Sequence, residues 1–304
     1  MFDVTLLTDP RYVAPKKSSP YIENVLLEDR LVLEALEKQG LKVIRKSWDD
    51  PDFDWTGTKF ALFRSTWDYF ERFGEFGQWL EKTAKLTQFI NSDRLIAWNM
   101  DKYYLLDLAN AGIAIPRTHF VEQGTDISLE EAYSLAVREQ GFQKSDIVLK
   151  PCVSGAARHT YRIREGEIPL HEAQFRKLVS EQSMMVQEFQ DHIVSQGEFS
   201  LIILDGSFSH AVLKRAKKGD FRVQDDHGGS VHVHQAEPDQ IEFAERVVQA
   251  CPEHPLYARV DIFRDNDGNW ALAELEIFEP ELWFRLRPQA ADDLARAIRK
   301  IKMG

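Results

Sequence analysis

The chain contains little cysteine: Cys152 and Cys251 are the two thiols among its 304 residues. Two thiols cannot form the disulfide framework of a small secreted protein, so the fold depends on a hydrophobic core. No apolar run approaches the roughly 20 residues that a membrane-spanning helix needs. The opening residues, MFDVTLLTDP, lack the basic and apolar segments of a signal peptide. We therefore expect a cytoplasmic protein that binds no membrane.

Basic residues are also fewer than acidic residues. The 38 Lys and Arg residues are outnumbered by 49 Asp and Glu residues, which leaves a formal net charge of −11. An acidic surface argues against binding to nucleic acid. The chain lacks the G-x-x-x-x-G-K sequence of a Walker phosphate loop as well. An anionic ligand would therefore need a local cluster of lysine and arginine.

The stretch Tyr257–Glu279 is the most informative part of the chain. Two alternating apolar runs flank the turn-forming sequence DNDG, a pattern typical of a β-hairpin. Because side chains alternate along a strand, Arg259 and Asp261 share one face of the first strand. A turn centred on the Asp-Gly pair places Asp261 opposite Glu274, and Arg259 opposite Glu276. Three carboxylates and one guanidinium would then converge.

Converging carboxylates are destabilising unless another charge offsets them. Mg²⁺ is the obvious candidate, because it binds one or two carboxylates together with substrate phosphates. A solvated, salt-bridged hairpin face is the other interpretation. The apolar neighbours that alternate with these acids indicate a core-packed hairpin and favour the metal: Val260, Ile262, Leu272, Leu275 and Ile277.

The first part of the chain alternates between predicted strands and helices. Strands are expected at Phe2–Leu7, Leu41–Arg45 and Phe60–Phe63, with a helix at Asn24–Gln39. Such alternation is typical of a parallel-sheet α/β domain. The sequence RSTWDY follows the third strand, at the edge where open α/β sheets place ligand contacts.

Two interpretations of RSTWDY stay open. Arg64 and Asp68 could contact a polar small molecule, or they could pair and cap the next helix while Trp67 packs in the core. Substrate specificity is expected around Thr8–Ser19, around this run, and in the loop Arg215–His234.

Candidate phosphate contacts occur further along the chain. A strand at Ile147–Leu149 ends at Lys150, and the small-residue loop Ser154–Ala157 follows. Such a loop can place backbone N–H groups over phosphates, but by itself it is a weak signal, and the pattern favours an ordinary hairpin. A later hairpin ends in a cluster that predicts either an anion site or a solvated basic loop: Lys214, Lys217, Lys218 and Arg222.

Three histidines raise a separate possibility. His232 and His234 share one face of a predicted strand, and His227 lies nearby, so the three could bind zinc. No cysteine or further histidine stands at the spacing of a zinc finger, which disfavours this interpretation.

Taken in order, these residues resemble the ATP-grasp superfamily from about Asn99 to Pro288, with Arg259-x-Asp261 followed by Glu274-x-Glu276 as the strongest element. The usual pattern has Asn where this chain has Glu276. Within the superfamily the chain is similar to glutathione synthetase-like ligases. It is most similar to the cycloserine-pathway cyclo-ligases, which close an O-ureido-serine ring, through its RSTWDY run and its ELEIFEP run.

The resemblance implies an α/β (α+β) ATP-grasp fold, in which two lobes grip ATP after a Rossmann-like α/β domain. We expect the N-terminal domain at residues 1–97, the small ATP-grasp lobe at 98–186, and the C-terminal lobe with the metal-binding hairpin at 187–304.

The resemblance also implies roles for individual residues. Lys102 and Lys150 would contact the α- and β-phosphates, and Glu198 would take the ribose hydroxyls. Two ions, Mg²⁺ or Mn²⁺, would be held by the three hairpin carboxylates, and Arg259 would stabilise a developing oxyanion. The remaining implied contacts are the phosphate-covering loop with Ser154, Gly155 and Ala156, the adenine hinge Gln187, Glu188 and Phe189, and the residues at the transferring phosphate, Lys214, Arg222 and Gln224.

The implied function is an ATP-dependent ligase that activates a small carboxylate as an acyl phosphate and couples it to an amine-type nucleophile. An intramolecular cyclo-ligase is a close variant. A non-catalytic ATP-binding protein on the same fold, and a phosphotransferase that stops after phosphorylation, are the alternatives. We expect small-molecule substrates, no nucleic acid or membrane partner, and possibly a homodimer, as in many relatives.

Overall fold

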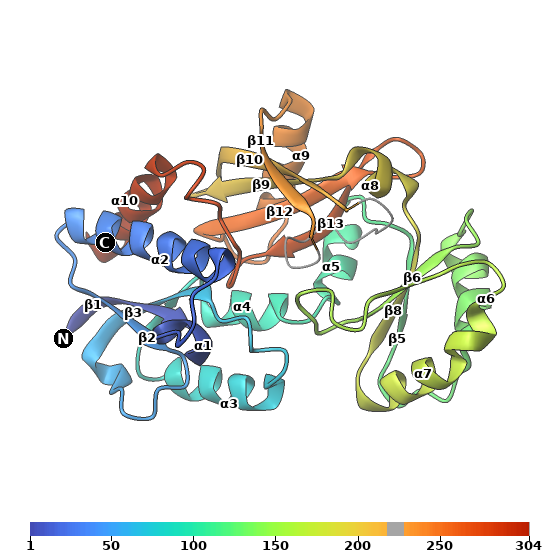
Figure 1. Ribbon diagram of the computed structural model, residues 1–304, viewed down its shortest axis with the longest axis horizontal. Coiled ribbons are helices and arrows are strands. Elements are labelled where there is room, and N and C mark those ends of the chain that lie inside the picture. The colour runs from blue at the N-terminus through green and yellow to red at the C-terminus, as the bar shows by residue number, and fades with distance from the viewer. Residues whose placement is uncertain (218–227, 304) are drawn as a thin grey trace.

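A computed structural model describes residues 1–217 and 228–303 of the chain. Its strands form three separate sheets (Figure 1). The N-terminal sheet lies at one end of the molecule, a small antiparallel sheet at the other, and the largest sheet joins them. None of the helices within these residues is both long and apolar enough to cross a membrane.

The N-terminal sheet is parallel, with strand order β2-β1-β3-β4. Its two central strands, β1 and β3, are buried along most of their length, as expected for a parallel sheet that is covered on both faces. Ser19 caps helix α2, and proline occupies the first position of that helix. The elements are β1 (Phe2–Thr8), α1 (Pro10–Val13), α2 (Pro20–Lys38), β2 (Val43–Ser47), the 3₁₀ helix η1 (Trp55–Gly57), β3 (Thr58–Ser65), α3 (Phe73–Thr83), β4 (Gln88–Ile90) and α4 (Asp93–Asn99).

The small sheet has the order β5-β8-β6-β7, and all its neighbouring strands are antiparallel. Two amphipathic helices, α6 and α7, pack their apolar faces on it around Phe175. A capping box between Ser128 and Glu131 fixes the start of α6. The elements are β5 (Thr118–Val121), α6 (Leu129–Gln140), β6 (Ile147–Pro151), β7 (Tyr161–Ile163), α7 (Ile168–Glu181) and β8 (Met184–Glu188).

The large sheet is antiparallel, with strand order β11-β10-β9-β12-β13. The final helix returns to the N-terminal domain and lies beside α2 (Figure 1). The elements are α5 (Tyr104–Asn110), α8 (Asp191–Gln196), β9 (Glu198–Leu204), β10 (Ser207–Arg215), β11 (Ser230–His234), α9 (Pro238–Gln249), β12 (Tyr257–Arg264), β13 (Trp270–Glu276) and α10 (Gln289–Met303).

The hairpin of β12 and β13 has the predicted pairing of charged residues. Arg259 lies opposite Glu276, and Asp261 lies opposite Glu274. The turn is centred on Asp267 rather than between Asp267 and Gly268, since the backbone N–H of Asp265 donates to the carbonyl of Asn269 at 2.8 Å. A β-bulge after Asp261 compensates for this offset. The predicted partners were therefore correct, although the predicted turn centre was wrong.

Buried polar side chains attach this hairpin to the N-terminal domain. Asn99 donates to the carbonyl of Leu275 at 2.8 Å and accepts from the N–H of Ile277 at 3.2 Å. The hydroxyl of Tyr257 lies 3.2 Å from the carbonyl of Phe63, in β3. These contacts fix the hairpin relative to the parallel sheet. The three domain ranges stay predictions, because one hydrophobic cluster includes residues of both the N-terminal and the large sheet.

Candidate active site

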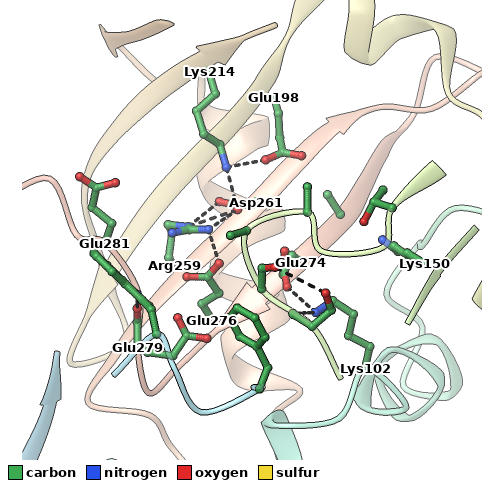
Figure 2. A pocket seen from close by; sticks show the side chains of 18 of the residues that line it. Lys102, Lys150, Glu198, Lys214, Arg259, Asp261, Glu274, Glu276, Glu279 and Glu281 are labelled. Carbon is green, nitrogen blue, oxygen red and sulfur yellow. Dashed lines mark hydrogen bonds and ion pairs between the residues drawn. The ribbon is translucent and has the colours of Figure 1, made fainter. Parts of the chain in front are cut away.

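A cavity of about 460 Å³ lies over the β12–β13 hairpin and is lined by residues from all three sheet regions (Figure 2). The sequence reasoning named its floor and much of its wall correctly as neighbours. The predicted site residues that line it are Lys102, Lys150, Ser154, Gly155, Ala156, Gln187, Glu198, Lys214, Arg259, Asp261, Glu274 and Glu276.

Asp261 is the centre of one charged group in this cavity. Arg259 donates to it through Nε at 3.0 Å and Nη2 at 2.8 Å, and Lys214 Nζ lies 2.9 Å from its Oδ2. Lys214 also lies 2.5 Å from Glu198, and Arg259 reaches Glu276. Burial opposes ionisation, but the two cations outweigh it and hold the pKa of Asp261 below its usual value.

Lys102 and Glu274 form a second charged group beside the first. Lys102 Nζ lies 2.9 Å from Glu274 and donates to the backbone carbonyl of Ser154 at 2.8 Å. Burial would raise the pKa of Glu274, but Lys102 and Lys150 together lower it. Burial lowers the pKa of Lys150 itself, which forms no ion pair among the described residues. Glu274 and Glu198 partly offset this effect, although neither lies within ion-pair distance of Lys150.

The loop after β6 approaches the N-terminal domain across the cavity. A Cβ atom on Gly155 would lie 2.6 Å from a ring carbon of Phe70, so a larger residue could not occupy this position without moving the ring. Ala156 and Ala157 have positive φ angles of 47° and 53°. Gly155 therefore lets the loop lie against the N-terminal domain, and the predicted phosphate-covering role of Ser154–Ala157 stays a prediction.

The adenine-hinge residues divide into two groups. Gln187 lines the cavity and donates to Thr118 at 2.8 Å. Glu188 is buried away from it, where it accepts from the N–H of Lys144 and from Arg117, both at 2.9 Å. The Phe189 ring lies under the guanidinium of Arg162, with 3.6 Å between the ring centroid and Cζ. Glu188 and Phe189 thus lie outside the cavity lining, and the predicted adenine hinge stays a prediction.

The structure does not bring Arg64 and Asp68 to the cavity. Arg64 is buried near Glu28 and Asp29, at 3.8 and 3.6 Å. Asp68 accepts from Trp48 at 2.8 Å and pairs with Arg72 at 3.0 Å, so the expected Arg64–Asp68 pair does not form. Trp67, which we expected as a core residue in one interpretation, lines the cavity instead.

Arg222 and Gln224, which were predicted to lie at the transferring phosphate, are outside the described residues. His227, one of the three candidate zinc ligands, is outside them as well. Of the remaining histidines, His232 Nε2 lies 3.0 Å from Ser230, and His234 Nε2 lies 2.9 Å from Gln240. Among residues 1–217 and 228–303, Asp261, Glu274 and Glu276 form a cluster of three potential metal ligands, and no such cluster includes a histidine.

The three carboxylates fit a divalent cation. One oxygen of each can be chosen so that all three lie within 4.8 Å of one another. Carboxylate oxygens are hard ligands of the kind that Mg²⁺ and Mn²⁺ prefer. Glu276 contributes a carboxyl group where the usual pattern has an amide; burial raises its pKa, and the neighbouring Arg259, which pairs with it, opposes that shift.

Sequence reasoning missed much of the cavity wall at the N-terminal domain. Glu279 was part of the quoted ELEIFEP run but received no role; it lines the cavity, and burial together with Glu274 raises its pKa to about 7. The region Thr8–Ser19, expected to govern specificity, does supply part of the wall. Lining residues that received no role in the sequence analysis include Arg11, Tyr12, Tyr21, Phe70, Glu281 and Trp283.

Two family models match separate parts of the chain. Residues 118–280 match the prokaryotic glutathione synthetase ATP-grasp domain, and residues 4–91 match the N-terminal domain of the D-cycloserine synthetase DcsG. The chain therefore belongs to the ATP-grasp family, as its motifs indicated. The predicted fold, with two ATP-grasp lobes after a Rossmann-like domain, is confirmed.

Individual relatives agree with this assignment. The chain is 30% identical over 284 residues to the cycloserine biosynthesis protein DcsG of Streptomyces lavendulae, which covers 88% of this chain and 91% of that protein. The crystal structure of D-cycloserine synthetase DcsG matches with a TM-score of 0.83 at 25% identity, over 98% of this chain and 99% of that chain. A D-alanine–D-alanine ligase from Bacillus anthracis matches with a TM-score of 0.65 at 16% identity, over 99% and 100% of the two chains, and shows the shared fold. The protein is an ATP-grasp ligase, from a family whose enzymes use ATP and divalent metal ions.

Proposed function

We propose that this protein is an ADP-forming ligase that activates a small carboxylate as an acyl phosphate and couples it to an amine-type nucleophile. The observation that carries the proposal is the arrangement of Asp261, Glu274 and Glu276, which alternate with cations in one cavity. Phosphoryl transfer depends mostly on positioning and on neutralising charge, and this arrangement can supply both.

Each cation has a place in this proposal. Lys150 and Lys102 lie on the small-lobe side of the cavity (Figure 2) and would contact the phosphates of ATP. Bound Mg²⁺ would supply positive charge at the phosphate oxygens. Lys214 and Arg259 would then face the transferred phosphate and the developing oxyanion, where Arg is suited to bidentate contacts. Glu198 and Gln187 would bind the nucleoside.

The loop at Ser154–Ala157 would exclude water. An acyl phosphate is hydrolysed by water, so the cavity must be covered while the nucleophile attacks. Gly155 already lies against Phe70, on the opposite side of the cavity. The carboxylate loses an oxygen as phosphate leaves, the amine nitrogen forms the new bond to carbon, and the amine releases a proton.

An intramolecular cyclo-ligase is the second candidate. The match of residues 4–91 to the N-terminal domain of DcsG favours it, because this domain supplies the cavity wall that holds Tyr12 and Trp67. In that case the carboxylate and the nucleophile would belong to one molecule such as O-ureido-serine.

Product analysis tests both candidates. The protein should release ADP and phosphate from ATP with O-ureido-serine, or with a pair drawn from a panel of amino acids, and mass spectrometry should detect the cyclised or coupled product. Chelation by EDTA should stop the reaction, and added Mg²⁺ or Mn²⁺ should restore it. A stable phosphorylated product without coupling would instead identify a phosphotransferase.

The variant Glu274→Gln separates a catalytic site from a nucleotide-binding protein. We expect turnover to fall by a factor of about 10³ or more, since one carboxylate of the metal group is lost. The matched control is Asp267→Asn in the exposed turn of the same hairpin, which should keep its activity. If the Glu274→Gln protein unfolds, the carboxylates are structural; if the native protein binds Mg-ATP tightly but turns over no carboxylate, the ligase proposal fails.

A further inference from the structure

The chain enters and leaves the small sheet through two connecting segments. The entry segment (residues 111–117) leads from α5 to β5, and the exit segment (residues 189–197) leads from β8 through α8 to β9. Residues at the start, in the middle and at the end of this exit line the cavity: Gln187, Ile193 and Glu198. The position of the exit segment therefore sets the part of the wall where the nucleoside would bind.

The turn of the β12–β13 hairpin contacts the exit segment through the side chain of Asn266. Its Nδ2 donates to the carbonyl of Phe189 at 2.9 Å, and its Oδ1 accepts from the N–H of Asp191 at 3.1 Å. A side-chain amide carries one donor and one acceptor group, so it can bind two backbone groups at once. Asn266 thus engages the exit segment as one residue of a neighbouring parallel strand would.

The contact is reciprocal. The backbone N–H of Asn266 donates to Gln190 Oε1 at 3.0 Å, and Gln190 Nε2 donates to the carbonyl of Glu188 at 3.0 Å. Gln190 is 5% exposed, so these hydrogen bonds are shielded from water. His192 Nδ1 lies 2.7 Å from the carbonyl of Asp265 in the same turn, and α8 lies beside β12 (Figure 1). Each partner therefore binds the backbone of the other.

The entry segment is attached to the same hairpin. The N–H of Leu272, in β13, donates to the carbonyl of Ala114 at 2.8 Å, and the N–H of Glu188 donates to the carbonyl of Arg117 at 2.9 Å. Asp261 and Glu274 lie further along the two strands of this hairpin. The element that carries the candidate metal ligands thus also holds both connections to the small sheet.

We propose that Asn266 is a positioning residue for the nucleotide, because it fixes the exit segment to the hairpin before ATP binds. Asn266 is not among the residues that line the cavity, so it acts through the exit segment. A wall that is already ordered reduces the free-energy cost of ordering on binding. This inference rests on the proposed function, since it takes ATP to be the ligand of this cavity.

An ion pair in the same turn does not explain the attachment. Arg117 Nη2 lies 2.9 Å from Asp267 Oδ2, and the side chain of Asp267 is exposed. Exposed ion pairs contribute little, because water and salt screen them. The amide contacts of Asn266 and Gln190 are instead directed at backbone groups, and they define one position of the exit segment.

Isothermal titration of the full-length protein with Mg²⁺ and a non-hydrolysable ATP analogue tests the inference without turnover. Asn266→Ala should weaken binding of the analogue roughly 10-fold, because the exit segment must then be ordered on binding. Asn269→Ala makes the same substitution at an exposed position of the same turn and should change the affinity by less than about twofold. With an active substrate, the loss in Asn266→Ala should appear in the KM for ATP rather than in kcat.

Two further variants separate hydrogen bonding from packing. Asn266→Asp keeps the size of the side chain but places an oxygen opposite the carbonyl of Phe189, so it should lose at least as much affinity as Asn266→Ala. Gln190→Ala should also weaken binding of the analogue. The double variant with Asn266→Ala should lose less than the product of the two separate factors, because the exit segment is released only once.

Hydrogen exchange followed by mass spectrometry locates the effect in the chain. Without ligand, amides of the exit segment should exchange roughly 10-fold faster in Asn266→Ala than in the native protein, while β9 and β12 keep their protection. The protection of these two strands also shows that the variant is folded. A saturating concentration of the analogue should restore most of the protection of the exit segment.

The positioning role is rejected if Asn266→Ala binds the analogue as tightly as the native protein, if Asn266→Asp behaves like the native protein, or if exchange increases evenly throughout the chain. It is also rejected if the native protein binds no ATP analogue. If affinity and exchange change as expected but the native protein forms neither ADP nor a coupled product, the positioning role stands and the ligase proposal fails.

Discussion

The two ends of the cavity use charge in different ways. At the nucleotide end, carboxylates and cations alternate in close pairs, such as Lys102 with Glu274 and Lys214 with Asp261. At the other end, Glu279 lines the cavity, accepts at its backbone carbonyl from the indole N–H of Trp67, and forms no ion pair within the described residues. In Figure 2 these two environments lie on either side of Glu276.

Under the proposed function, the end with paired charges would bind the nucleotide. A triphosphate with its metal carries many charges of both signs, so the paired side chains at this end could exchange partners with it on binding. Substitutions at one end should therefore leave ligand binding at the other end largely unchanged.

The largest effect is expected for Asp261, which contacts two cations on the floor of the cavity. Asp261→Asn removes the carboxylate that holds both Arg259 and Lys214. We expect turnover to fall by a factor of about 10³ or more and the free energy of unfolding to fall by about 3 kcal/mol or more, because two buried cations lose a partner. Steady-state kinetics and urea unfolding measure the two effects. Asp267→Asn, on the same hairpin but exposed, should change neither; equal effects of the two variants would contradict the central role of Asp261.

A smaller effect is expected for Lys150, at the end of the cavity where the phosphates of ATP would bind. Lys150→Met removes the buried cation that has no described ion-pair partner. We expect the KM for ATP to rise roughly 10- to 100-fold, with little loss of stability because a buried amine is costly to keep charged. Affinity for the amine substrate should not change. Lys144→Met, which alters an exposed lysine paired with Asp191, is the control in the same lobe. A parallel loss of amine binding in Lys150→Met would break the separation of the two ends.

The smallest effect concerns His210, a buried histidine that contacts the chain segment after β13. Its Nε2 lies 2.8 Å from the carbonyl of Leu282, between Glu281 and Trp283 in sequence. Burial lowers the pKa of His210 to about 4. Because the unfolded chain binds this proton near pH 6.5, the stabilisation is complete above pH 6.5 and is lost as the pH falls towards 4.

Urea unfolding at pH 7.5 and pH 5 checks this linkage. The native protein should lose about 2 kcal/mol more than His210→Gln between these two pH values, since the other titrating groups are common to both proteins. An identical loss in both proteins would show that His210 does not titrate as its burial indicates.

Local sequence pattern was sufficient to predict the β12–β13 hairpin and many of the residues that line the cavity near Lys102 and Lys150. Alternation along β12 and β13 placed Arg259, Asp261, Glu274 and Glu276 on one face, because strand periodicity is a property of the backbone. The turn centre was misjudged, yet the bulge after Asp261 restored the pairing. A sequence pattern contains no direct signal for such a bulge.

Arg64 illustrates the opposite case. Its position after β3 indicated a ligand contact, but the structure places it in a buried group with Glu28 and Asp29. Its neighbour Trp67 lines the cavity instead. Adjacent residues at the end of a strand point to different sides, and which side meets the cavity depends on how the domains pack.

The sequence by itself determined the fold class, the charged face of the hairpin and the types of residue that contact phosphates, because these depend on local periodicity and on motifs within short stretches. Only the tertiary structure decided which residues line the cavity at the N-terminal domain. Tyr12, Trp67 and Glu279 are brought together by the packing of the N-terminal domain against the segment after β13, and no local spacing in the chain encodes that contact.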